Sequence, residues 1–140
     1  MMLYLLDVNL LIALTNPSHL HHQRAHAWFS TITSWATTSM TEASFLRLML
    51  HPHVAGRSIP TAEVMSVLHG LRALPGHFFL PDDSTLANPV IDITALMAHN
   101  QVTDMHLVNL AAQHGGVLAT FDAGIPATLA LADRQFVAVI

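Results

Sequence analysis

Residues 3–14 read Leu-Tyr-Leu-Leu-Asp-Val-Asn-Leu-Leu-Ile-Ala-Leu, and this stretch decides the fold. Residues 3–8 are the short apolar run that a strand buried in a parallel sheet requires. Residues 9–14 follow as a predicted helix, which Asn16-Pro17 ends. An acidic residue, Asp7, therefore stands where a buried strand passes into a helix.

The same alternation of strand and helix continues through the chain. Further strands are predicted at residues 35–38, 77–80, 117–120 and 136–140. Further helices are predicted at residues 19–32, 39–50, 60–74, 92–99 and 103–114. This order predicts an α/β sandwich on a mostly parallel sheet of four to five strands. No repeat or Gly/Ser-rich linker interrupts it, so residues 1–140 are expected to form a single domain.

The composition excludes several classes of protein. The chain has no cysteine, which rules out a disulfide framework, a zinc ribbon and a thiol nucleophile. Charged residues are 10% of the chain and apolar residues 52%, so we expect a partner or a second copy to cover part of the surface. The net charge of −4 excludes a generic basic arm for nucleic acids. The N-terminal run lacks a basic region and a cleavage site, and no stretch is long enough to span a membrane, which predicts a cytosolic protein.

Four acidic residues occupy special positions in the predicted fold. Asp7 ends the first strand, and Asp122 lies two residues past the strand at 117–120. Glu42 and Asp104 each lie near the start of a predicted helix. Because strand ends and the following helix starts share one edge of a parallel sheet, Asp7, Glu42 and Asp122 are expected at the same rim. Asp104 joins them if its helix begins over that rim.

Two of these acids share a helix face with apolar residues. Glu42 precedes Phe45 by three positions, and Asp104 precedes Leu107 by three. A bare carboxylate on such a face is costly, and neighbouring carboxylates repel one another. A divalent cation such as Mg²⁺ or Mn²⁺ removes both costs, because these ions take oxygen ligands.

Helix capping is the alternative explanation for each acid taken alone. Ser39-Met-Thr-Glu42 fits a capping box, Thr103 can cap the helix that contains Asp104, and Asp7 or Asn9 can cap the first helix. Their joint placement on one rim favours the metal site. The remaining acids are assigned to caps and turns: Glu63, Asp82, Asp83, Asp92 and Asp133.

An ordered set of short motifs carries a resemblance to a known family. The motifs are Leu-Leu-Asp-Val-Asn at 5–9, Thr-Ser-Met-Thr-Glu at 38–42 with Phe-Leu-Arg at 45–47, Thr-Asp at 103–104 with Leu107, and Ala-Thr-Phe-Asp at 119–122. In this order they resemble PIN-domain proteins, specifically the VapC-type ribonuclease toxins of toxin–antitoxin pairs. The resemblance covers essentially the whole chain and implies a PIN-like fold.

The resemblance also implies an activity and a site. The catalytic and metal-binding quartet of the family falls on Asp7, Glu42, Asp104 and Asp122, and its supporting polar positions fall on Asn9 and Thr120. The implied activity is hydrolysis of RNA with Mg²⁺, for which Mn²⁺ can substitute. The implied partners are an antitoxin protein, the RNA substrate and a second copy of the chain. The chain departs from the family in having no lysine and a net negative charge.

Basic residues and histidines offer further candidates. Arg47 and Arg24 are candidates for binding RNA, whereas Arg57 and Arg72 are expected to be solvated. His22 and His26 have the spacing of a zinc pair, but without a His-Glu-x-x-His motif ordinary surface histidines are favoured. The alternative function is a catalytically silent PIN-like interaction module whose acids are helix caps.

Overall fold

The computed structural model describes residues 2–94, 96 and 98–140. Its centre is a sheet of five parallel strands in the order β3-β2-β1-β4-β5. The strands are β1 (Leu3–Leu6), β2 (Ser34–Thr38), β3 (His77–Leu80), β4 (Val117–Thr120) and β5 (Val137–Val139). The predicted α/β fold with a parallel sheet is confirmed.

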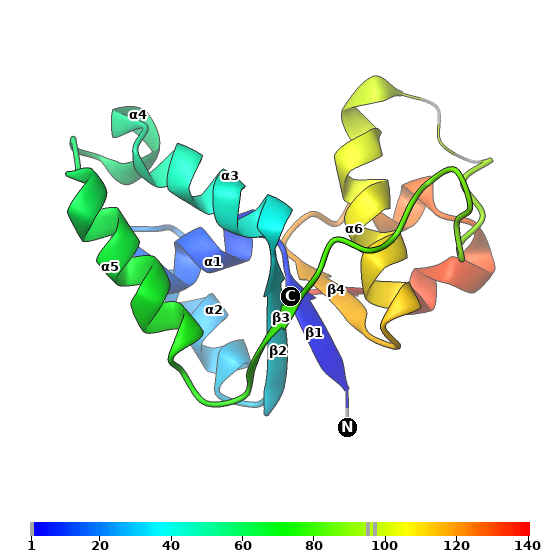
Figure 1. The fold of residues 1–140 in the computed structure, drawn as a ribbon, viewed down its shortest axis with the longest axis horizontal. Coiled ribbons are helices and arrows are strands. Elements are labelled where there is room, and N and C mark those ends of the chain that lie inside the picture. Colours follow the sequence, from blue (N-terminus) through cyan, green and yellow to red (C-terminus); the bar gives the residue numbers. More distant parts are fainter. Residues whose placement is uncertain (1, 95, 97) are drawn as a thin grey trace.

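Helices cover both faces of the sheet (Figure 1). One side carries α1 (Val8–Thr15), α2 (His22–Phe29), α3 (Ser39–Met49), α4 (Pro52–Ala55) and α5 (Thr61–Arg72). The other side carries α6 (Val102–Gln113) and the 3₁₀ turns η1 (His99–Gln101), η2 (Pro126–Thr128) and η3 (Leu131–Phe136). None of the helices in the described ranges is both long enough and apolar enough to cross a membrane.

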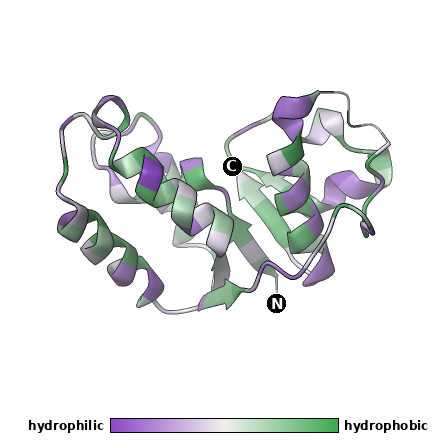
Figure 2. Ribbon diagram, turned by 45° about the horizontal axis from the view of Figure 1, so that its top comes forward, coloured by the Kyte–Doolittle hydropathy of each residue, from purple (hydrophilic) through white to green (hydrophobic). Residues whose placement is uncertain are grey.

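Adjacent residues of the central strand face opposite sides and so belong to two cores. Leu6 packs with Leu10 and Phe45 under the helices α1 to α5. Leu5 packs with Leu118 and Val108 under α6. Such a strand is apolar on both faces, as a strand inside a covered parallel sheet must be. Much of the sheet is coloured toward the hydrophobic end of the scale (Figure 2).

The structure differs from the predicted helices in three places. The helix predicted at 92–99 is absent from the described residues of that range, which leave out 95 and 97. Asp92 Oδ1 instead accepts hydrogen bonds from both N and Oγ1 of Thr94, at 2.9 and 2.6 Å. This side-chain turn competes with a helix. The helix predicted at 19–32 is limited to α2. The short helix α4 was not predicted; His51 Nδ1 accepts from His53 N at its start.

The strand order positions the site. Since β1 lies between β2 and β4, the residues that follow these three strands meet at the carboxyl edge of the sheet. Asp7 is tied to that edge by its N–H, which donates to the Ala119 carbonyl at 2.9 Å. The first strand thus delivers its acid beside the end of β4.

Candidate functional site

A cavity of about 240 Å³ opens at the carboxyl edge of the sheet. Three carboxylates line it: Asp7 after β1, Asp104 on α6 and Asp122 after β4. Asn9 and Arg47 also line it. We refer to this cavity as the acidic pocket. It brings together three of the four acids that the sequence placed in a quartet.

Asp7 is the most deeply placed of the three, with 6% of its surface exposed. Its Oδ1 accepts from Val8 N at 2.8 Å and its Oδ2 accepts from Thr120 Oγ1 at 2.9 Å. Burial raises the pKa of Asp7, the two hydrogen bonds oppose that rise, and the charge of Asp122 adds to it. The carboxylate is therefore held in a fixed orientation at an electrostatic cost.

Thr120 links two of the acids. Its hydroxyl donates to Asp7 and accepts from the N–H of Asp122 at 3.0 Å. Asp122 in turn accepts from Gly124 N through Oδ1 at 2.8 Å. A threonine at the end of β4 thus sets the positions of carboxylates that lie more than a hundred residues apart in sequence.

Asp104 has the clearest electrostatic signature of the pocket. Burial, together with the charges of Asp7 and Asp122, raises the pKa of Asp104 to about 6. The N-cap of α6 is Gln101, so the predicted Thr103 cap is wrong, and Asp104 lies in the first turn. No side-chain cap bond is formed at this helix start, so capping accounts for Asp104 poorly.

Glu42 does not line the acidic pocket. The predicted capping box of Ser39 and Glu42 is wrong, because Thr38 is the N-cap of α3 and Thr41 Oγ1 accepts from its N–H at 3.0 Å. Glu42 Oε2 instead accepts from Thr37 Oγ1 at 2.6 Å and from the guanidinium of Arg72. The structure thus separates the fourth acid from the other three.

A partly buried chain of polar contacts holds Glu42 in this place. Thr37 gives its one hydroxyl hydrogen to Glu42, so His77 Nε2, 2.8 Å away, must donate to Thr37. Desolvation, aided by the charge of Arg72, lowers the pKa of His77. Arg72 also lies over the Phe79 ring at 5.1 Å, so it is exposed, as predicted, but has specific partners that the sequence did not indicate. The contact between Arg72 and Glu42 spans 30 residues, so no local pattern could reveal it.

The other predicted basic residues fall in different places. Arg47 lines the acidic pocket and is its one cation among the described residues. Arg24 lies outside the pocket, over the Phe121 ring at 4.8 Å, next in sequence to Asp122. Arg57 pairs with Glu63 at the surface, at 2.9 Å.

The histidine pair of α2 serves the fold. His22 Nδ1 lies 2.7 Å from the Ala13 carbonyl and His26 Nε2 lies 2.8 Å from the Leu14 carbonyl. Both rings donate to the free carbonyls at the end of α1. Over residues 2–94, 96 and 98–140, no three histidine or acidic side chains are placed to hold a metal ion together.

Comparison with known proteins gives a consistent picture. No family model matches the sequence. Several ribonucleases of Mycobacterium tuberculosis are similar to it, among them the following three. VapC38 is 45% identical over 123 residues, covering 86% of each chain, and VapC39 is 44% identical over 124 residues, covering 86% of this chain and 89% of the relative. VapC29 is 36% identical over 125 residues, covering 89% of each chain.

A solved structure agrees with the fold. The crystal structure of M. tuberculosis VapC20, titled a sarcin-ricin loop cleaving toxin, matches with a TM-score of 0.60 at 13% identity. The match covers 89% of this chain and 93% of that chain. It confirms the predicted PIN-like α/β sandwich.

Proposed function

Because the chain belongs to the VapC family of ribonucleases, we propose that it is a metal-dependent endoribonuclease, the toxin of a toxin–antitoxin pair. The observation that best supports this proposal is the gathering of Asp7, Asp104 and Asp122 around one cavity. Burial and mutual repulsion raise the pKa of two of them. A cation in the pocket would offset both the cost of burying a charged carboxylate and the repulsion between the carboxylates.

The donor set of the acidic pocket fits Mg²⁺, with Mn²⁺ as a substitute. Both ions prefer carboxylate oxygens, and Mg²⁺ keeps several waters while binding one or two carboxylates, so three convergent side chains are not required. We propose Asp7 and Asp104 as the direct ligands, with Asp122 completing the site through a metal-bound water, since the described residues hold no group of three direct ligands. When bound, the cation supplies Lewis acidity and lowers the pKa of bound water.

The remaining residues orient the groups that react. Thr120 keeps the Asp7 carboxylate aligned, and Asn9 adds a polar side chain to the wall of the pocket. Arg47 binds a phosphate that flanks the scissile bond, which offsets the acidic surroundings. Arg24 is a second, more distant candidate for a phosphate contact. Glu42 acts through water, either as an outer ligand or as the base that orients the attacking water.

The partners follow from the family and from the surface. Large apolar side chains are exposed, among them Leu20 at 89%, Leu131 at 79% and Phe78 at 54%. Such a surface favours association, and we propose an antitoxin protein and a second copy of the chain as its partners. Because RNA is the proposed substrate, the cytoplasm is the compartment in which the enzyme is expected to act.

One observation favours the alternative of a catalytically silent interaction module. Asp7 is the N-cap of α1 and accepts from Val8 N, as a purely structural cap does. The same explanation does not extend to Asp104, because burial and then the charges of Asp7 and Asp122 raise its pKa, and no side-chain cap bond forms at its helix start. The nuclease therefore accounts for more of the pocket.

A calorimetric Mn²⁺ titration tests the proposal, with RNA cleavage in Mg²⁺ and in chelator as the second step. The wild-type chain is expected to bind saturably and Asp104→Asn to lose that binding. Glu63→Gln is the matched control, because Glu63 belongs to an exposed surface pair. Absence of binding by folded wild-type protein would refute the metal-dependent enzyme and leave the interaction module.

A further inference from the structure

A second cavity adjoins the acidic pocket. Its volume is about 360 Å³, and it shares the side chains of Met40 and Thr103 with the acidic pocket. Its other walls come from α6 and from the segment that follows β3, including Asp82, Ser84 and Leu86. The second cavity is therefore within reach of a nucleotide that neighbours one bound in the acidic pocket.

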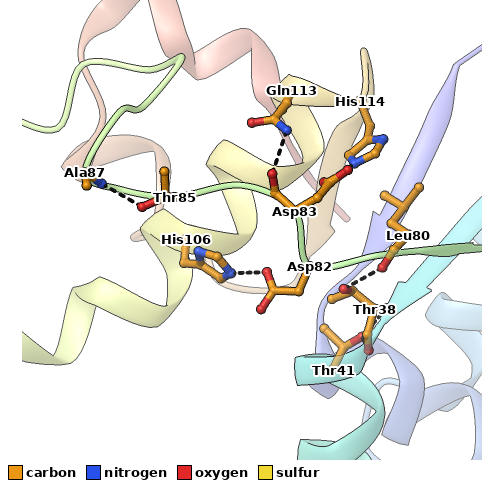
Figure 3. A network of polar contacts seen from close by, with 10 residues as sticks. All are labelled: Thr38, Thr41, Leu80, Asp82, Asp83, Thr85, Ala87, His106, Gln113 and His114. Atoms are coloured by element: carbon orange, nitrogen blue, oxygen red, sulfur yellow. Dashed lines mark hydrogen bonds and ion pairs between the residues drawn. The ribbon is translucent and has the colours of Figure 1, made fainter.

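The wall formed after β3 is fastened to α6 by two consecutive acids (Figure 3). His106 Nε2 lies 2.6 Å from Asp82 Oδ1, and His114 Nε2 lies 2.7 Å from Asp83 Oδ1. Gln113 Nε2 also donates to the Asp83 carbonyl, at 3.0 Å. Because α6 carries Asp104 as well, the second cavity is fixed relative to the acidic pocket.

Three polar side chains of this wall have hydrogen-bonding capacity that no described residue uses. The Ser84 hydroxyl is buried and has no hydrogen-bond partner among the described residues. Thr85 Oγ1 accepts from Ala87 N at 3.1 Å, which leaves its own hydrogen available. Asp82 uses Oδ1 for His106, and no described residue bonds to its other oxygen. A buried polar atom without a partner calls for a ligand or a water.

We propose that this cavity receives the base of a nucleotide next to the scissile bond and favours a base with an exocyclic amino group over uracil. The proposal rests on the proposed nuclease function. Met40, Leu86 and Val102 offer apolar contacts to the face of a base. The free oxygen of Asp82 accepts from an amino N–H, and the exposed Thr85 hydroxyl donates to a ring nitrogen or carbonyl.

Cytosine and uracil provide the sharpest comparison. At position 4 cytosine carries an amino group, which donates to a carboxylate, whereas uracil carries a carbonyl, which a carboxylate repels. Adenine and guanine also carry amino groups, so they belong with cytosine. The preference thus depends on one acceptor, Asp82, and the neighbouring Asp83 does not line the cavity.

The test is an NMR titration of the full-length, ¹⁵N-labelled chain in chelator with CMP, UMP, AMP and GMP. Amide signals of Ser84, Thr85 and Leu86 are expected to shift saturably with CMP and about fivefold more weakly with UMP, the effect of one hydrogen bond. Asp82→Asn should remove the preference, and Asp83→Asn, the matched control, should keep it. Should Asp82→Asn fail to fold, Thr85→Val replaces it and should weaken CMP binding.

Three results would overturn the proposal: no shift at these amides, equal shifts with CMP and UMP, or equal shifts with ribose 5-phosphate. The Mn²⁺ titration of the same chain, in buffer free of chelator, separates this failure from failure of the enzyme. Retained metal binding without a base preference removes only the base site. Lost metal binding in a folded wild-type chain removes the proposed function.

Discussion

Replacing Asp104 by asparagine should stabilise the metal-free chain. The substitution keeps the shape of the side chain and removes one of three charges that face the acidic pocket. The pKa of Asp104 rises to about 6, mainly because of burial and then because of Asp7 and Asp122. Its ionised form therefore costs the folded state free energy that an amide does not.

The size and sign of the effect follow from that pKa. A rise from 3.8 to about 6 corresponds to roughly 3 kcal/mol, and because Asp104 is partly exposed we expect solvent screening to leave about 1–2 kcal/mol. The carboxyl favours the folded state while it is protonated, which is complete below its unfolded pKa. This contribution is lost as pH rises through about 6, so the full destabilisation is present at neutral pH.

Thermal unfolding in chelator measures the prediction. At about pH 7.5, Asp104→Asn should melt about 3–6 °C above the wild type, and at about pH 4 the two should coincide. Glu63→Gln, which removes an equal charge from an exposed pair, should change the melting temperature by less than about 2 °C. An unchanged or lower melting temperature at neutral pH, or a gain that persists at pH 4, would contradict the repulsion described for the pocket.

Three further predictions concern the groups around the site and the fold. Thr120→Val should cost about 2 kcal/mol and weaken Mn²⁺ binding about tenfold, and Thr120→Ser should restore both, as measured by urea unfolding and calorimetry. Gly76→Ala should cost at least about 3 kcal/mol, because a β-carbon would lie 2.0 Å from a backbone oxygen at a φ of +82°, whereas Gly56→Ala, at the same φ in open space, should cost about 1 kcal/mol. If the two variants lose equal free energy of unfolding in urea, the expected clash at Gly76 is absent and this prediction is wrong. Arg72→Gln should lower the free energy of unfolding by about 1 kcal/mol and Arg57→Gln by less than about 0.5; similar values would deny Arg72 its special contact.

Much of the fold could be predicted because its signals are local. A strand apolar on both faces, followed by an acid and a helix, is visible within residues 3–14. The prediction of a helix at 92–99 was wrong because it relied on hydrophobic spacing. It did not take account of a competing local signal, the Asp92 side chain that bonds to Thr94. Aspartate two residues before threonine favours such a turn.

The site could be predicted only in part, for a different reason. Asp7 and Asp122 are placed by strand ends, which the topology brings to one edge. The orientation of Glu42 depends on Arg72 and His77, which approach it from α5 and β3. Such contacts between distant segments leave no periodic trace in a single sequence.

The hydrogen bond from Thr120 to Asp7 joins residues 113 positions apart, across a pairing of the first strand with the fourth. During synthesis the chain carries Asp7 on the ribosome long before Thr120 and Asp122 exist. A nascent chain can fold its first helices, yet the acidic pocket stays unfinished until β4 docks against β1. For a protein proposed to cut RNA, this topology delays assembly of the site. The ribosome that translates the chain does not meet an assembled acidic pocket until most of the chain has been made.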